Sequence, residues 1–166
     1  LELFTSRVAK VGMTDGIRQV LQEESDALRA YYEQAGILIA RPAGGTSCRL
    51  AISAKGGTNA ENHNHNDVGS YAVALGSETM VGDQGGPNSY PGDYFNGDAP
   101  QKYKIKGSFG HPVPVVDGRT QSSGGKAKGV VLQKEFTNEK DVFSIDYTSA
   151  YSTPNLDKLI RTFVYD

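Results

Sequence analysis

The sequence has one cysteine, few histidines and no long hydrophobic segment, and each shortage excludes a class of protein. Because Cys48 is the single cysteine among 166 residues, no disulfide can form within the chain, and cysteine pairing gives no clue to the redox compartment. No apolar stretch approaches the roughly 18 residues that a transmembrane helix needs. Lysine and arginine (17) nearly balance aspartate and glutamate (19), without a long basic run, so the electrostatic footprint of a nucleic-acid-binding protein is absent.

The composition is that of one globular domain. Hydrophobic residues make up 37% and charged residues 22% of the chain, which is enough apolar material for a core and excludes a disordered chain. The sequence begins at Leu1 and ends at Asp166, directly after an apolar stretch, 159–165, with the character of a strand. We therefore expect a piece of a longer protein, truncated at its C-terminal end.

One helical pattern precedes a long β-type region. Between residues 14 and 32, apolar side chains recur at spacings of three and four, and Thr14 or Asp15 is suited to cap the start. From Gly36 onward, glycines and prolines separate short runs of β-branched and aromatic residues. The predicted division is a helical or linker segment, residues 1–32, followed by a β domain, residues 33–166.

The β-type region predicts a series of short strands. Several of them alternate apolar and polar residues, and this period of two indicates sheets with one covered face. No further helical segment is long enough for a βαβ crossover, so an antiparallel sandwich or an open barrel is expected. The expected strands are Ile37–Arg41, Arg49–Ala54, Gly69–Leu75, Thr79–Gly82, Tyr103–Lys106, Val113–Val116, Lys128–Phe136, Val142–Tyr147 and Leu159–Val164.

All three histidines fall between residues 63 and 111. His63 and His65 precede an expected strand, and on extended backbone residues i and i+2 face the same way, so both rings should face one cavity, with Asp67 continuing the row. If residues 76–78 form a hairpin turn, Asp83 returns beside this histidine segment. His111 follows the irregular stretch 82–110, and long irregular stretches in compact domains are usually functional.

Two imidazoles, one carboxylate and an open position form a common zinc set, which Mn, Fe and Ni also accept. His65, Asp83 and His111 are therefore candidate ligands. The simpler interpretation is that each histidine is an ordinary hydrogen-bonded side chain. Cupins also carry a His-x-His pair on a sandwich strand, but their motif needs a glutamate a few residues later, and Asn66-Asp67-Val68 follows here.

In order and spacing, four segments of the chain resemble the C-terminal β-sandwich region of heparinase II/III-like polysaccharide lyases. The resemblance implies an all-β, antiparallel, supersandwich-like β-sandwich, with His65, Asp83 and His111 at the three zinc-ligand positions and His63 lining the catalytic cleft. It departs at Gln84, where many relatives have proline. The segments are Gly36–Pro42 (GILIARP), Glu61–Tyr71 (ENHNHNDVGSY), Gly82–Tyr90 (GDQGGPNSY) and Gly110–Gly118 (GHPVPVVDG).

The resemblance further implies cleavage of uronic-acid-containing polysaccharides, glycosaminoglycan- or alginate-like, by β-elimination in the periplasm or at the cell surface. Other catalytic groups would come from an N-terminal α/α toroid domain that this chain lacks. In such an enzyme the zinc mainly holds loops together, and His63 either acts on the substrate or orients the site. The resemblance does not decide which polysaccharide is cleaved, whether the protein forms a homodimer, or whether another divalent metal takes the place of zinc.

Aromatic and basic side chains complete the expected site. Tyr90 and Tyr94 are candidates to stack on sugar rings, although tyrosines in β proteins are more often half-buried packing residues. Lysines 102, 104, 106 and 126 are candidates to meet an acidic glycan, or form a solvated strand face. The alternative function is a metal-stabilised carbohydrate-binding or structural sandwich without catalysis; a cupin-like isomerase or oxygenase would need a further ligand.

Overall fold

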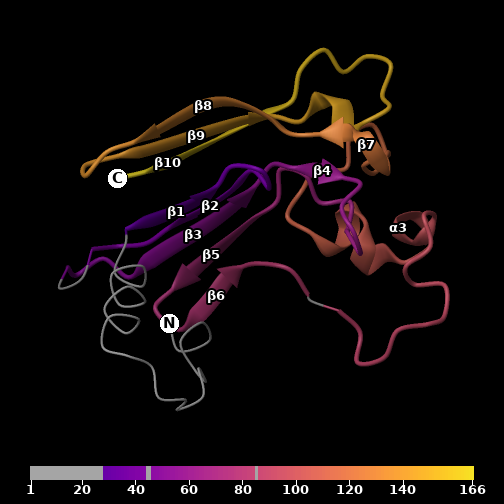
Figure 1. The fold of residues 1–166 in the computed structure, drawn as a ribbon, viewed down its shortest axis with the longest axis horizontal. Helices are drawn as coiled ribbons and strands as arrows, with labels where there is room; N and C mark the ends of the chain where they lie inside the picture. The colour runs from indigo at the N-terminus through magenta and orange to yellow at the C-terminus, as the bar shows by residue number, and fades with distance from the viewer. Residues whose placement is uncertain (1–27, 44–45, 85) are drawn as a thin grey trace.

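The computed structural model describes residues 28–43, 46–84 and 86–166, and these form two facing layers of antiparallel strands (Figure 1). This confirms the prediction of an all-β, antiparallel sandwich. The larger layer has the order β1-β2-β3-β5-β6 and the smaller layer the order β10-β9-β8. The larger layer consists of β1 (Arg29–Tyr32), β2 (Ile37–Ala40), β3 (Leu50–Lys55), β5 (Tyr71–Leu75) and β6 (Glu78–Val81); the smaller consists of β8 (Val130–Phe136), β9 (Asp141–Asp146) and β10 (Ile160–Tyr165).

A third, two-stranded sheet lies at one end of the sandwich, beside the loops and short helices (Figure 1). It pairs β4 with β7, and none of the short helices exceeds four residues among those the structure describes. None of the described helices is long and apolar enough to cross a membrane. These elements are β4 (Thr58–Asn59), β7 (Gly124–Lys128), α3 (Ala99–Lys102), η1 (Lys104–Lys106), η2 (Ser108–Gly110) and η3 (Thr148–Ala150).

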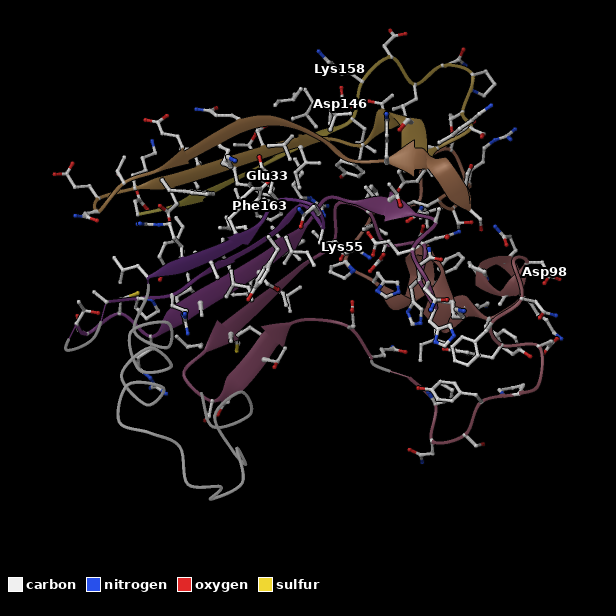
Figure 2. All side chains as sticks on the ribbon, viewed as in Figure 1. Glu33, Lys55, Asp98, Asp146, Lys158 and Phe163 are labelled. Carbon is white, nitrogen blue, oxygen red and sulfur yellow. The ribbon has the colours of Figure 1, made fainter. Side chains whose placement is uncertain are left out.

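The core lies between the two layers because the strands alternate. Phe143 and Ile145 on β9 are fully buried, and so is Leu38 on β2. Phe163 of β10 reaches across to Tyr71 of β5, with ring centroids 5.6 Å apart, and Figure 2 shows Phe163 between the layers. This burial of alternate apolar side chains is the main force holding the layers together.

One ion pair also joins the layers. The Arg29 guanidinium on β1 lies 2.8 Å from the carboxylate of Asp141 on β9, whose side chain is almost completely buried. A buried carboxylate needs such a partner, because removing it from water without compensation is costly.

The predicted helix at 14–32 is wrong at its C-terminal end. Residues 14–27 lie outside the described ranges, but Arg29–Tyr32 is strand β1, paired with β2 from Tyr32↔Ile37 onward. The Tyr31 ring contacts the rings of Phe136 and Phe143, so packing between the layers overrides a helix-like spacing. Within the described residues, the sandwich therefore already includes Arg29–Tyr32, ahead of the predicted boundary at residue 33.

Two of the predicted strands do not form, although the structure describes their residues. The stretch 103–106 contains the 3-10 helix η1, and 113–116 forms one isolated bridge, Val116↔Arg119. Pro112 and Pro114 have no N–H to donate to a ladder, which explains the second case. The predicted strand 128–136 is divided at Gly129 between β7 and β8, and β4 was not predicted because two residues carry no recognisable period.

The hairpin expected ahead of Asp83 is confirmed. β5 and β6 pair from Leu75↔Glu78 outward, with Gly76 and Ser77 forming the turn. Gly76 has φ +64°, a conformation that glycine adopts without steric cost and that two-residue hairpin loops favour. The strand then ends at Val81, and the chain continues through Gly82 to Asp83.

Candidate functional site

The predicted site residues lie on loops at the end of the sandwich that carries β4 and β7. The histidine loop, which we define as residues 60–70, connects β4 to β5, while the chain after β6 runs across to α3 (Figure 1). Lys55, at the end of β3, lies where the larger sheet meets these loops (Figure 2). Its Nζ donates to the buried Asp67 carboxylate over 2.6 Å and lies 3.9 Å from the Glu61 carboxylate, so Lys55 fixes the histidine loop to the sheet.

His111 contacts both of the other predicted metal ligands. His65 Nδ1 lies 3.0 Å from His111 Nε2, and His111 Nδ1 lies 2.8 Å from Asp83 Oδ1. The contacts join residues 46 and 28 positions apart in the sequence. The His111 side chain is buried, whereas the Asp83 side chain is 47% exposed, so the group extends from the interior to the surface.

The protonation states of these side chains suit a cation. Burial, followed by the neighbouring His111, lowers the pKa of His65, so its ring is neutral near pH 7. The hydrogen bond from His111 lowers the pKa of Asp83, which keeps this carboxylate ionised. Neutral imidazole and ionised carboxylate are the forms that bind zinc, and the chemistry of the donor set therefore fits this metal.

The arrangement differs from a completed metal centre in the position of Asp83. Its carboxylate faces the second nitrogen of His111, which is how a carboxylate orients a metal-bound histidine. In the described ranges, no three His, Cys, Asp or Glu side chains already surround a common metal position. Ligation by all three residues, as predicted, requires the Asp83 carboxylate to turn away from His111 Nδ1.

His63 and His65 do not share one face as expected. Residues 61–64 form a turn, with Asn64 N donating to Glu61 O, and His63 has φ +58°. This left-handed conformation is uncommon for a residue with a side chain and is often found at functional sites. The i, i+2 rule applies to extended backbone only, and here His63 stacks on Phe95 while His65 contacts His111. Asp67 pairs with Lys55 instead of continuing the row.

His63 lines a cleft of about 570 Å³ at this end of the molecule. Its ring stacks on Phe95, with centroids 4.2 Å apart and planes inclined by 26°. Four asparagines contribute to the walls, and the amides of Asn59 and Asn64 are bonded within the protein. Asn62 and Asn96 are exposed beside the Phe95 ring, a combination suited to a hydroxyl-rich ligand. The lining comprises Asn59, Ala60, Glu61, Asn62, His63, Asn64, Phe95, Asn96, Gly97, Pro100, Lys106, Ser123 and Gly124.

The two predicted sugar-stacking tyrosines have different environments. Tyr94 is 1% exposed and packs against Tyr90, Phe95 and Tyr103, which contradicts a stacking role because no face of its ring is free. Tyr90 is 57% exposed and keeps its predicted role as a proposal. The structure adds Phe95 to the candidate stacking residues. Its ring is partly exposed inside the cleft, and the sequence analysis considered tyrosines only.

Of the four candidate lysines, Lys106 is unlike the rest. It is buried, its Nζ donates to Tyr94 O over 2.6 Å, and burial lowers the pKa of its ammonium group. Lys102 pairs with Asp93 at the surface, and Lys104 and Lys126 are exposed. The prediction of a solvated lysine face along 102–106 is therefore wrong for Lys106.

A buried amide network holds the histidine loop. The Gln121 side chain accepts from Asn59 Nδ2 (2.9 Å) and Val68 N (3.1 Å) and donates to Val68 O (2.7 Å). Asn66 Nδ2 donates to Gln121 O over 3.1 Å. Gln121 lies more than 50 residues from Asn59, Asn66 and Val68, and no local pattern in the sequence indicates its role.

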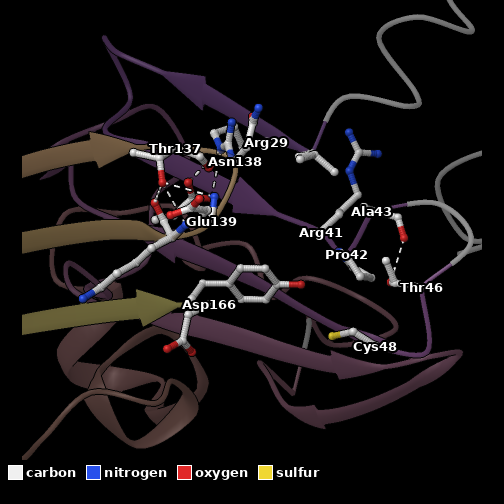
Figure 3. Close-up of a pocket in the computed structure, with 14 residues that line it drawn as sticks. Arg29, Arg41, Pro42, Ala43, Thr46, Cys48, Thr137, Asn138, Glu139 and Asp166 are labelled. Atoms are coloured by element: carbon white, nitrogen blue, oxygen red, sulfur yellow. Dashed lines mark hydrogen bonds and ion pairs between the residues drawn. The ribbon is translucent and has the colours of Figure 1, made fainter.

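A second cavity, of about 160 Å³, lies between the start of β1, the β2–β3 connection and the β8–β9 turn (Figure 3). Figure 3 shows Arg29, Arg41, Cys48 and Asp166 around it. Its described lining includes no histidine, and two of its charged side chains, Arg29 and Asp141, already neutralise each other. The larger, histidine-lined cleft is therefore the stronger candidate site.

Comparison with protein-family models and with curated proteins finds no match to this chain. The resemblance to heparinase II/III-like lyases consequently rests on the four sequence segments named above. The class that fold and site define is an all-β sandwich with a polar cleft beside a histidine–carboxylate cluster.

Proposed function

We propose that this chain forms the zinc-binding region and one wall of the active cleft of a lyase that cleaves uronic-acid-containing polysaccharides by β-elimination. The observation that carries the proposal is the meeting of His65, His111 and Asp83 from distant segments, next to a cleft lined by His63. These are the residues that the sequence resemblance implies for the zinc and for the cleft.

In a β-elimination, a base removes the proton α to the uronate carboxylate. A carbon–carbon double bond forms, the bond to the 4-linked oxygen breaks, and that oxygen receives a proton. Negative charge develops on the carboxylate side of the sugar, so a cleft for this reaction needs nearby donors or cations.

His63 is the residue of this chain that we assign to the substrate. Among the described residues, its ring stacks on Phe95 and makes no hydrogen bond, and the residue is exposed at the cleft. A residue whose role is to orient the site would be fixed by hydrogen bonds, as His111 is by Asp83. His63 would neutralise charge or relay a proton, with further groups supplied by a toroid domain outside this chain.

The zinc would be held by His65 and His111, with Asp83 as ligand or as the orienting partner of His111. When bound, it supplies a positive charge that joins the histidine loop to the segments carrying Asp83 and His111. Removal of the metal with a chelator should therefore lower the thermal unfolding temperature of the chain, and unchanged stability would contradict this role.

The decisive experiment compares His63→Ala with His65→Ala, two changes of equal size on the same loop. In the full-length protein, turnover is followed by the absorbance of the unsaturated uronate product, and bound zinc by elemental analysis. We expect His63→Ala to retain zinc and lose turnover by about 100-fold or more, the typical contribution of a positioned acid or base, and His65→Ala to lose both.

Unchanged turnover of His63→Ala on every acidic glycan would favour the alternative, a metal-stabilised carbohydrate-binding or structural sandwich. Failure of the wild-type chain to take up zinc would refute the metal site itself. Localisation at the cell surface or in the periplasm, and a homodimer, are further parts of the proposal that follow from the resemblance alone.

A further inference from the structure

Lys106 is a buried cation at the edge of a polar cleft. It is 2% exposed, yet it belongs to the lining of the cleft that His63 also lines. Its ammonium group lies 5.1 Å from the centroid of the Phe95 ring and 4.6 Å from that of Tyr94. Both rings offer their faces to a cation, but such contacts only partly replace the lost hydration of an ammonium group.

The hydrogen bonds of Lys106 are incomplete. An ammonium group has three donors, and the described residues supply one acceptor, the Tyr94 carbonyl. None of the ion pairs among these residues includes Lys106, whereas Lys55 and Lys102 each pair with an aspartate. A buried cation with unused donors and no ion-pair partner among the described residues is costly for the protein alone.

The neighbourhood of Lys106 is suited to a carboxylate that belongs to a ligand. The cleft walls carry asparagine amides, which bind hydroxyl groups, and Phe95 offers its ring to a sugar face beside His63. An anion placed at Lys106 would supply the missing counter-charge to an ammonium group that is itself buried, where such a pair is stronger than at the surface.

We propose that Lys106 is the carboxylate-binding residue of the cleft, and that it selects acidic over neutral sugars. This inference rests on the proposed function for the substrate class and adds the group that recognises it. It also separates Lys106 from Lys104, which is close in sequence but exposed, with its Nζ 5.7 Å from the centroid of the Phe109 ring.

The test measures binding, not turnover, on the full 166-residue chain. The probes are an unsulfated glucuronate-containing tetrasaccharide and a mannuronate tetrasaccharide, each paired with its carboxyl-reduced, neutral counterpart. Affinities come from NMR titration, which suits weak binding. The variants are Lys106→Met, which keeps the length of the side chain, Lys106→Arg, which keeps the charge, and Lys104→Met as the matched control.

We expect the wild-type chain to prefer at least one acidic probe over its neutral counterpart. Lys106→Met should lose this preference through a drop of about 10- to 100-fold in affinity for the acid, the range for one charge-assisted hydrogen bond. Affinity for the neutral probe should stay within about twofold, a result that general damage to the cleft would not give. Lys106→Arg and Lys104→Met should keep the preference.

A preference that survives in Lys106→Met overturns the inference. If Lys106→Met does not fold, the decisive signal is the wild-type Lys106 Cε–Hε resonance, assigned by its absence in Lys106→Arg. A shift with the acidic but not the neutral probe supports the inference, and no shift overturns it. A wild-type chain that binds no acidic probe also overturns it, while lyase activity of the full-length protein would leave the proposed function standing.

Discussion

In the two layers of the sandwich, most of the buried side chains are apolar, whereas the loop end also buries amides, an imidazole and an ammonium group. Phe143 and Ile145 exemplify the first region, and Gln121, His111 and Lys106 the second. Apolar burial is non-directional and tolerates small changes of shape, while buried polar groups are stable only when each finds its partner. The loop end is therefore the region where geometry is most strictly specified and where single polar substitutions matter most.

Loss of a core ring should have the largest effect. Phe143→Ala removes a fully buried side chain that contacts Tyr31 across the layers, and the expected loss in free energy of unfolding is about 3–5 kcal/mol. Urea unfolding monitored by circular dichroism measures it. Leu132→Ala, on the 51% exposed Leu132 of β8, is the control and should change stability by less than about 1 kcal/mol. Equal losses would mean that the core is not where the burial pattern places it.

The polar counterpart of that experiment is Gln121→Leu. It leaves the Asn59 amide and the backbone groups of Val68 without their buried partner, which should cost about 1–3 kcal/mol. Hydrogen exchange should accelerate in the histidine loop while β9 stays protected, because the damage is local. Gln133→Leu, at an exposed position of β8, is the control. Uniform acceleration across β9 as well would remove the distinction between the two regions.

Gly69 lies where the histidine loop joins β5, so it tests the coupling of the two regions. It has φ +83°, and a Cβ there would lie 3.0 Å from the Tyr147 ring. Gly69→Ala should destabilise the chain by about 1–3 kcal/mol through backbone strain and this contact. Gly118→Ala is the matched control, since Gly118 also has positive φ (+69°) but an open surrounding. Equal losses in the two variants would show that Tyr147 does not limit the position.

The smallest expected effect is on the loss of stability at low pH. Hydrogen bonds from the side chain and backbone of Thr148 hold the pKa of Asp146 below its ordinary value. A depressed carboxylate pKa stabilises the fold above the unfolded-state pKa and loses that contribution as the pH falls through the lower, folded-state pKa. Asp146→Asn should therefore reduce the loss of stability on acidification below about pH 4, as measured by thermal unfolding across pH. An unchanged acid profile would contradict this assignment.

The local patterns in the sequence predicted most of the sandwich and little of the site's interior. The alternation in 142–147 and the Gly76 turn depend on neighbouring residues, so they could be recognised without the fold. Strand β1, the burial of Tyr94 and the role of Gln121 depend on partners far along the chain. The hairpin indicated that Asp83 returns beside the histidine segment, but no local pattern brought His111 there, and the turn at His63 was missed.

The left-handed backbone at His63 has a consequence for how this position responds to change. Glycine adopts φ +58° without strain, so His63→Gly would relax the turn and delete the ring in one step. His63→Gly should then raise the thermal unfolding temperature and, under the proposed function, lower turnover. A residue with a purely structural role would not show this trade-off. Under the proposed function, the ring of His63 is the reason why a turn that favours glycine carries a histidine.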